Sequence, residues 1–381
     1  MKKAVLILTI FLLLNTSLIA INTQSIHQNK ISLDEQTTNI NQSTIMKNLN
    51  KLPIYQEEKL KHFQSNNLNK FIFSPEDIEL KDDAFHRAKR LHFTEWWYFD
   101  CVFDNGYTLQ VGIRVLSIIN KFIIFVRIDI YKDGVLESHE IKPYFYWDFF
   151  ASKELPIVEL KKKQVMEGHI DNSTGAWVYN LSLELDKSSV ELCFIGWTKG
   201  WKGKTPGGNW AVILPKAEVF GTITLDNKKI NVSGIGYHDH NWEITIFTTI
   251  NFGWLWGKVN SNNYTITWTK VITTRFWGQL LLVINEKNGN YTNIEPEYIN
   301  LKIKDIRIEK GMLVPYKFIL SAHKKEITLN ITMEVFDTHH IRMMGIINHC
   351  RYHMKCTGSI TVGPNAELID EIQIAEYIRL R

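Results

Sequence analysis

Short stretches of alternating apolar and polar residues, separated by turn signals, dominate the chain from residue 92 onward. The aromatic run at residues 93–103 precedes the turn signal Asp-Asn-Gly at 104–106, and residues 107–115 then alternate as a returning strand. Helical periodicity is nearly absent, and strands at this spacing with hairpin turns favour an antiparallel barrel or sandwich. Further strands are predicted at residues 122–131, 137–145, 164–171, 176–185, 189–196, 219–225, 278–285, 299–309, 316–322, 326–336, 352–362 and 367–379.

The second half of the chain contains a faint copy of the first. The segment that begins at Trp97 aligns without a gap on the segment that begins at Trp254, and both share a turn asparagine and a Tyr-Thr-aliphatic triplet. Self-similarity of this kind predicts two related β-domains in tandem, each opening with a Trp-rich hairpin. We predict a signal peptide at residues 1–21, a partly disordered linker with a short helix at 22–83, and β-domains at 84–245 and 246–381.

The N-terminus has the pattern of a secretory signal peptide. Lys2 and Lys3 precede an apolar run at residues 4–14, which is short for a membrane span. Leu18 stands where a small residue favours cleavage, so an uncleaved N-terminus that tethers the protein to a membrane is the alternative. We therefore expect an extracytoplasmic protein that is secreted, periplasmic or at the cell surface. The four cysteines are compatible with that location but too few for a disulfide scaffold.

Composition narrows the classes of ligand. The formal net charge of the 381-residue chain is only +4, so we expect no nucleic-acid partner, which would require a concentrated basic patch. The 12 tryptophans favour an aromatic-lined cavity. Several of them surround the Gly-rich segment at residues 200–208, which we predict to be a loop, either a plain surface loop or a lid over the cavity mouth.

The densest group of reactive side chains lies at residues 237–242. Because side chains alternate along a strand, Tyr237, Asp239 and Asn241 should share one face. If this face looks into a barrel, aromatic surroundings raise the pKa of the Asp239 carboxyl, since its charged form loses hydration. A carboxyl that is protonated near neutral pH can protonate an alkene, and Tyr and Trp rings would stabilise the resulting carbocation. The alternative is a structural aspartate that hydrogen-bonds the backbone at a bulge between the domains.

The opposite face of this stretch carries His238, His240 and Trp242. Two histidines on one strand face could ligate a metal, but a site also needs a third and a fourth ligand, and no further motif supplies them. The His and Cys residues at 349–356 do not converge, because they alternate to opposite faces of a strand. We therefore expect no metal and no cofactor, and we interpret His238 and His240 as structural neighbours of the bound ligand.

The first aromatic strand contributes further candidates. Glu95 is either a second acid that faces the cavity or part of a structural ion pair with Arg114, and we favour the structural role. Four tryptophans are expected to line or support the cavity, namely Trp96, Trp97, Trp242 and Trp254.

Three motifs extend this interpretation: EWWYF at residues 95–99, GIGYHDHNW at 234–242 and GWLWG at 253–257. Together they resemble the carotenoid 1,2-hydratase (hydroxyneurosporene synthase) superfamily, which also includes kievitone hydratase-like enzymes and cyclases of the Diels–Alderase type. The resemblance spans residues 85–381. It implies two lipocalin-like antiparallel β-barrels in tandem, with a hydrophobic ligand near their junction and no metal or organic cofactor.

The resemblance also implies a catalytic residue. In the hydratases the Asp of the Tyr-X-Asp motif is taken as the proton donor to a carbon–carbon double bond, and the matching residues here are Asp239 and Tyr237. The chain departs from the pattern at Glu243, where a Gly often follows the Asn-Trp pair. Our leading hypothesis is an exported hydro-lyase that binds an isoprenoid-like lipophile and uses Asp239 as general acid. The alternatives are a non-catalytic carrier of an apolar ligand and, third, a metal-dependent enzyme.

Overall fold

The computed structural model describes residues 72–87, 92–118, 121–244, 253–272, 278–343 and 347–380. The predicted signal peptide and most of the predicted linker lie outside these residues. Phe73–Arg381 form one compact unit. Among the described residues we find no helix with the length and hydropathy that a membrane span requires.

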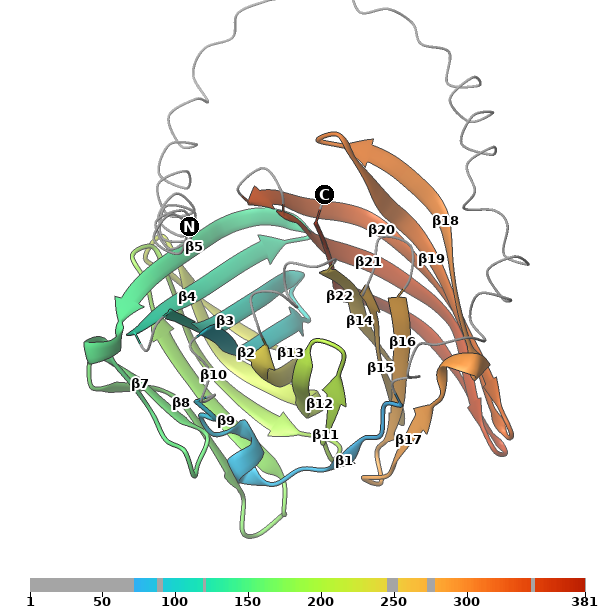
Figure 1. Ribbon diagram of the computed structural model, residues 1–381, viewed down its shortest axis with the longest axis horizontal. Coiled ribbons are helices and arrows are strands. Elements are labelled where there is room, and N and C mark those ends of the chain that lie inside the picture. The colour runs from blue at the N-terminus through green and yellow to red at the C-terminus, as the bar shows by residue number, and fades with distance from the viewer. Residues whose placement is uncertain are drawn as a thin grey trace, which may run out of the picture. The chain divides into compact units, whose positions relative to one another are not determined.

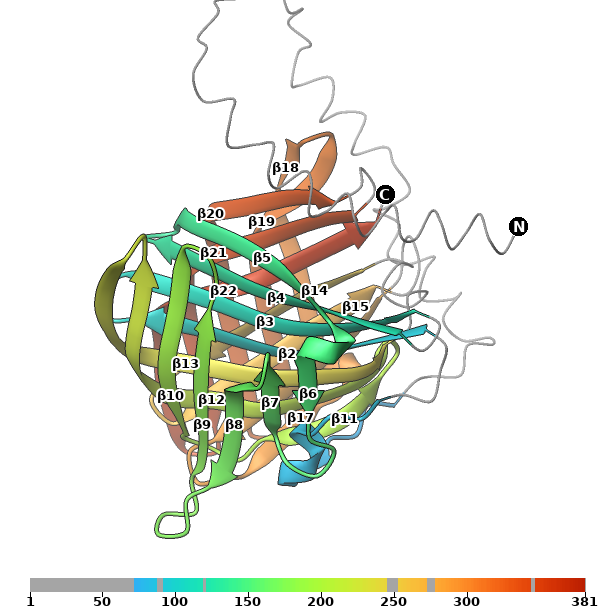
Figure 2. The same ribbon diagram turned by 90° about the vertical axis from the view of Figure 1, so that its left-hand side faces the viewer.

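The first sheet curls into a nearly closed barrel (Figures 1 and 2). All of its pairings are antiparallel, in the order β5-β4-β3-β2-β13-β12-β10-β9-β8-β7-β6, with β11 joining β12 to β1. The first long strand of this sheet, β2, pairs with its last strand, β13. The strands are β1 (Glu76–Asp77), β2 (His92–Phe103), β3 (Tyr107–Ile118), β4 (Lys121–Lys132), β5 (Val135–Phe145), β6 (Phe149–Ala151), β7 (Ile157–Leu160), β8 (Lys163–Ile170), β9 (Trp177–Glu184), β10 (Ser188–Gly196), β11 (Trp201–Thr205), β12 (Gly208–Leu225) and β13 (Lys228–Ile244).

The second sheet forms a half-barrel with edge strands β17 and β18, and, as in the first sheet, an early strand, β14, pairs with the last strand, β22. Its order is β17-β16-β15-β14-β22-β21-β20-β19-β18. The strands are β14 (Gly253–Asn260), β15 (Tyr264–Ile272), β16 (Gly278–Glu286), β17 (Tyr291–Ile294), β18 (Ile299–Glu309), β19 (Met312–Lys324), β20 (Ile327–Met343), β21 (Ile347–Val362) and β22 (Asn365–Leu380). Short 3-10 helices are η3 (Leu80–Asp83), η4 (Tyr146–Asp148) and η5 (Pro296–Tyr298).

This architecture confirms the predicted all-β fold of two antiparallel barrels in tandem, with the first sheet a nearly closed barrel and the second a half-barrel. The tandem alignment differs from the structure by one residue on the opening strand of the second sheet. Trp97 packs in the core of the first sheet, whereas Leu255, and not the aligned Trp254, packs in the core of the second. Cysteines do not link the sheets, because all four thiols are free.

The outer faces of the two sheets meet in a layer that is rich in polar groups. Lys258 Nζ on β14 donates to Asp100 Oδ1 on β2 at 2.5 Å. Arg351 on β21 donates from Nη1 to the Tyr98 hydroxyl at 2.6 Å. Charged hydrogen bonds and ring contacts in this layer hold the two sheets together. One face of β13 also lies against this layer, through the contact of Tyr237 with Trp256.

The predicted loop at residues 200–208 is wrong. Residues 201–205 form strand β11, which pairs with the beginning of β12. Trp201 is fully buried, its ring packs edge-on against Trp210 at 5.0 Å, and its Nε1 donates to Asn285 Oδ1 at 3.1 Å. Burial of the two indoles outweighs the loop signal of the glycines, so this segment is part of the barrel wall.

Candidate functional site

Strand β13 presents the candidate residues on two faces, as strand alternation predicts. The ring of His238 points into the first barrel and stacks on Phe99 at 3.8 Å between centroids. The ring of Tyr237 points the other way, toward the second sheet, and lies 5.2 Å from Trp256. The face with Asp239 therefore looks at the junction of the sheets, and the histidine face looks into the barrel.

The Asp239 carboxylate is held by three neutral donors. Trp210 Nε1 and the Tyr237 hydroxyl both donate to Oδ2 at 2.9 Å. Asn241 Nδ2 donates to Oδ1 at 3.1 Å. The residue is only 5% exposed, and in the described part of the chain no cationic side chain forms an ion pair with it.

These surroundings leave the carboxyl close to half-protonated at neutral pH. Burial raises the pKa of Asp239 to about 7, although the hydrogen bonds from Trp210 and Tyr237 act against it, and the nearby negative charge of Asp100 adds to the rise. A group with this pKa can both release and recover a proton near pH 7.

Trp210 is a contact that the sequence analysis missed. It lies on β12 directly opposite Asn241 of β13. The aromatic surroundings of the Gly-rich segment were a visible signal, but that segment was assigned to a loop. A strand assignment would have placed this indole beside the acidic stretch.

The two histidines of β13 share a buried carboxylate. Asp83 Oδ2 lies 2.9 Å from His238 Nε2, and Asp83 Oδ1 lies 3.2 Å from His240 Nδ1. All three side chains are completely buried. Burial alone would raise the pKa of Asp83, but the two imidazoles outweigh it and lower that pKa to about 2. Asp83 ends η3, within the segment predicted to be a linker, and no local pattern marked it.

Glu95 joins this cluster from β2. Its Oε1 lies 3.1 Å from His240 Nε2 and accepts the backbone N–H of His86 at 2.8 Å. Burial would lower the pKa of His240, but Asp83 and Glu95 raise it to about 9. The alternative pairing of Glu95 with Arg114 is wrong, because the Arg114 guanidinium lies over the ring of Trp96, 4.8 Å from its centroid. Adjacent residues of a strand face opposite sides, which separates Glu95 from Trp96 and its partner.

The four predicted tryptophans fall into two groups. In the barrel, Trp97 stacks on His240 at 4.7 Å and Trp242 stacks on His86 at 4.0 Å. Between the sheets, the rings of Trp96 and Trp254 are nearly parallel at 6.4 Å. They therefore flank two separate clusters.

Glu243, next to the candidate site on β13, has an unusual backbone conformation. Its φ of 56° lies in the left-handed region that favours glycine, and the pairing of β13 with β2 shifts between Asn241 and Ile244. The chain thus keeps at this bulge a backbone conformation suited to glycine, although it carries a glutamate. Glu243 Oε2 accepts a hydrogen bond from Asn209 Nδ2 at 2.9 Å, which helps to hold that conformation.

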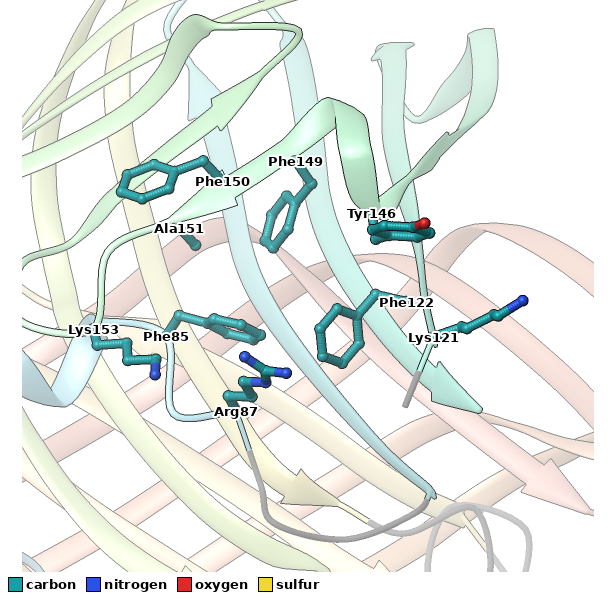
Figure 3. A pocket seen from close by; sticks show the side chains of 9 residues that line it. All are labelled: Phe85, Arg87, Lys121, Phe122, Tyr146, Phe149, Phe150, Ala151 and Lys153. Carbon is teal, nitrogen blue, oxygen red and sulfur yellow. The ribbon is translucent and has the colours of Figure 1, made fainter. Parts of the chain in front are cut away.

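An aromatic pocket of about 570 Å³ lies by the segment that precedes β2 (Figure 3). Its rings come from that segment, from the start of β4 and from the region around η4 and β6. Asp239 does not line it. The lining residues are Phe85, Arg87, Lys121, Phe122, Tyr146, Phe149, Phe150, Ala151 and Lys153.

Comparison with known proteins finds similar solved structures but no match by sequence. No family model matches the sequence, and no curated protein matches it. A crystal structure from Nitrosomonas europaea described as AttH superposes with a TM-score of 0.58 at 12% identity, over 80% of this chain and 97% of that one. Kievitone hydratase from Nectria haematococca gives 0.49 at 12% identity, over 75% and 88% of the chains, and CghA gives 0.49 at 9%, over 76% and 88%. The AttH likeness shows a shared fold.

Proposed function

We propose that the protein binds a lipophilic, isoprenoid-like molecule at the junction of its two sheets and hydrates a carbon–carbon double bond, with Asp239 as general acid. The observation that carries this proposal is a buried carboxyl with a pKa of about 7 that is held only by neutral donors. The N-terminal sequence supports the further proposal that the protein acts outside the cytoplasm.

The hydrogen bonds of Asp239 assign its two oxygens different roles. Oδ2 accepts two hydrogen bonds, from Trp210 and Tyr237, whereas Oδ1 accepts only one, from Asn241, so we assign the transferable proton to Oδ1. Transfer of this proton to one alkene carbon forms a C–H bond and leaves a carbocation on the neighbouring carbon. Water then adds to the cation and returns a proton to the carboxylate, so the net reaction is addition of water.

Aromatic rings beside Asp239 suit such an intermediate. Trp256 lies 5.7 Å from the ring of Tyr98 and 5.2 Å from that of Tyr237, and Tyr98 is directly opposite Asp239 on the neighbouring strand. Ring faces attract positive charge, and the attraction grows when water is excluded. The same rings already face cations, since Lys258 Nζ lies 5.2 Å from the Tyr237 centroid and 5.6 Å from that of Trp256, and such rings would stabilise a carbocation more than a neutral alkene.

A non-catalytic carrier is the second candidate, and the pocket in Figure 3 favours it. Five aromatic rings line that pocket, together with the cations Arg87, Lys121 and Lys153. Such a lining fits an apolar molecule with an acidic group. In this reading, Asp239 is a structural residue, and its three hydrogen bonds serve the contact between the sheets.

One set of variants separates the two candidates. Native mass spectrometry of protein from its own source would identify the bound lipophile, and turnover of that compound would then be measured. For the hydratase we expect Asp239→Asn to lose about 10²- to 10⁴-fold in kcat with binding retained. Glu243→Gln, which changes an exposed carboxylate at the end of the same strand, should leave turnover unchanged.

The carrier makes the opposite prediction. Ligand would quench tryptophan fluorescence equally in wild type and Asp239→Asn, no product would form, and Phe149→Ala would weaken binding. Wild-type turnover by a folded Asp239→Asn variant would refute the role of Asp239.

A further inference from the structure

Three side chains with metal-ligating atoms converge inside the first barrel, on the face of β13 opposite Asp239. Glu95 Oε1 lies 3.1 Å from His240 Nε2 and 3.5 Å from His86 Nδ1, and the three ligand atoms lie within 4.8 Å of one another. Ligand atoms about 2.0–2.2 Å from one metal ion are themselves roughly 3–3.5 Å apart. We propose that His86, Glu95 and His240 bind a divalent transition-metal ion.

Neighbouring groups hold each ligand in place. His240 Nδ1 lies 3.3 Å from its hydrogen-bond partner, the Asp82 carbonyl oxygen, and 3.2 Å from Asp83 Oδ1, which leaves Nε2 of the same ring directed at Glu95. A backbone carbonyl or a carboxylate on the far nitrogen of a ligating histidine is the usual support for a metal site. The N–H groups of His86 and Arg87 donate to Glu95 at 2.8 and 3.2 Å and fix its carboxylate.

His86 has a free ligand atom and a fixed ring. Its Nδ1 is buried and accepts or donates no hydrogen bond within the described part of the chain. Stacking on Trp242, with an angle of 5° between the planes, sets the orientation of the imidazole. This nitrogen is oriented and lies 3.5 Å from a carboxylate oxygen without a hydrogen bond between them, which is the position that a metal ligand takes.

Charge also favours a cation here. Asp83 and Glu95 are both completely buried, and neither pairs with a lysine or an arginine among the residues that the structure describes. Their ion-pair partners are histidines, His238 and His240 for Asp83 and His86 and His240 for Glu95, and a divalent ion would supply the compensating charge that these buried carboxylates need. One divalent ion would neutralise both while His86 and His240 stay neutral, which is the state in which imidazole ligates.

The ligand set indicates the class of metal. Two imidazole nitrogens and one carboxylate oxygen suit Zn²⁺ or Fe²⁺ better than Mg²⁺ or Ca²⁺, which take oxygen ligands. Three protein ligands leave a coordination position for water or an organic group. Phe85 and Arg87, the chain neighbours of His86, line the pocket in Figure 3, so that group has a space close by.

From the sequence we expected no metal, because no motif supplied further ligands beside His238 and His240, and a metal-dependent enzyme was the third alternative. In the structure, His238 contacts Asp83 and is not a ligand of this site. The partners of His240 are His86, from the segment before β2, and Glu95, from β2. This inference does not depend on the activity proposed for Asp239.

Zinc binding by untagged, chelator-treated protein tests the site. We expect isothermal titration with ZnCl2 to give one ion per chain and MgCl2 to give none. His86→Ala should weaken zinc binding by more than about 10-fold. The matched control is His139→Ala, because His139 has nearly the same exposure, 24% against 25%, and also contacts a buried carboxylate.

A second variant separates loss of the metal ligand from loss of folding. His86→Phe keeps an aromatic ring for stacking on Trp242 but has no ligand atom, so it should fold and still lose zinc. Co²⁺ bound to wild type should give visible absorption bands, absent in His86→Phe and present in His139→Ala. Folded wild type without stoichiometric zinc or cobalt, or equal binding by wild type and His86→Phe, would overturn the proposal.

Discussion

Asp83 and Asp239 are two buried aspartates on opposite sides of strand β13, Asp83 at the end of η3 and Asp239 on the strand itself, yet they differ in ionisation. Asp83 is fully buried with a pKa of about 2, whereas Asp239 is 5% exposed with a pKa of about 7. Asp239 accepts hydrogen bonds on both oxygens, whereas Asp83 has a histidine nitrogen near each oxygen but a hydrogen bond on Oδ2 only. The partners of Asp83 are imidazoles that can carry charge, and those of Asp239 are an indole, a phenol and an amide. In this interior, the charge of the partners decides ionisation more than the number of hydrogen bonds does.

Replacement of each aspartate by asparagine gives the largest expected contrast. Asp83→Asn removes the charge between two buried histidines, and the loss in free energy of unfolding should be about 3–5 kcal/mol. Asp239→Asn removes a buried charge that lacks a cationic partner, so this variant should lose no free energy of unfolding at pH 7.5. Urea denaturation with equal m-values measures both. Equal losses in free energy of unfolding for the two variants would show that the two aspartates do not differ in the charge of their partners.

The dependence of stability on pH should have opposite signs at the two sites. The folded pKa of Asp239 is raised from 3.8 to about 7, so its stabilising contribution is complete below 3.8 and is lost as pH rises through 7. This shift corresponds to about 4 kcal/mol. The folded pKa of Asp83 is lowered from 3.8 to about 2, so its contribution is present above 3.8 and is lost as pH falls through 2.

The measurement is the difference in free energy of unfolding between wild type and Asp239→Asn from pH 4 to pH 8. Wild type should lose stability relative to the variant across this range. Parallel curves would show that the pKa of Asp239 is ordinary, and the proposed acid would then lack its physical basis.

Removal of a single hydroxyl on each face gives the smallest contrast. Tyr237→Phe deletes one donor to Asp239 Oδ2, which stabilises the carboxylate, so the pKa of Asp239 should rise by about one unit. Carbon-13 NMR of labelled aspartate measures this shift. The matched control is Tyr179→Phe, because Tyr179 is also a fully buried tyrosine but packs against His238 on the barrel face. A similar shift in both variants would mean that the change does not act through the hydrogen bond.

Much of the fold could be predicted because its signals are local. Side chains alternate along every strand, and turn residues separate the strands, so the hairpin of β2 and β3 could be read directly from residues 93–115. The strand at residues 201–205 could not be predicted from its Gly-rich sequence, since its conformation depends on burial of Trp201 against Trp210. The predicted domain limits and export signal stay predictions.

Alternation also separated Tyr237 and Asp239 from His238 and His240, because the period of a strand is a property of its backbone alone. It could not decide which face enters the barrel. Nor could it supply Asp83, whose partner His238 is 155 positions away along the chain. The ionisation of a buried group depends on whatever charge lies within a few ångströms, and only packing of distant segments determines that. The sequence by itself therefore determined which residues of β13 belong together, and the tertiary structure decided which of them meet charged partners.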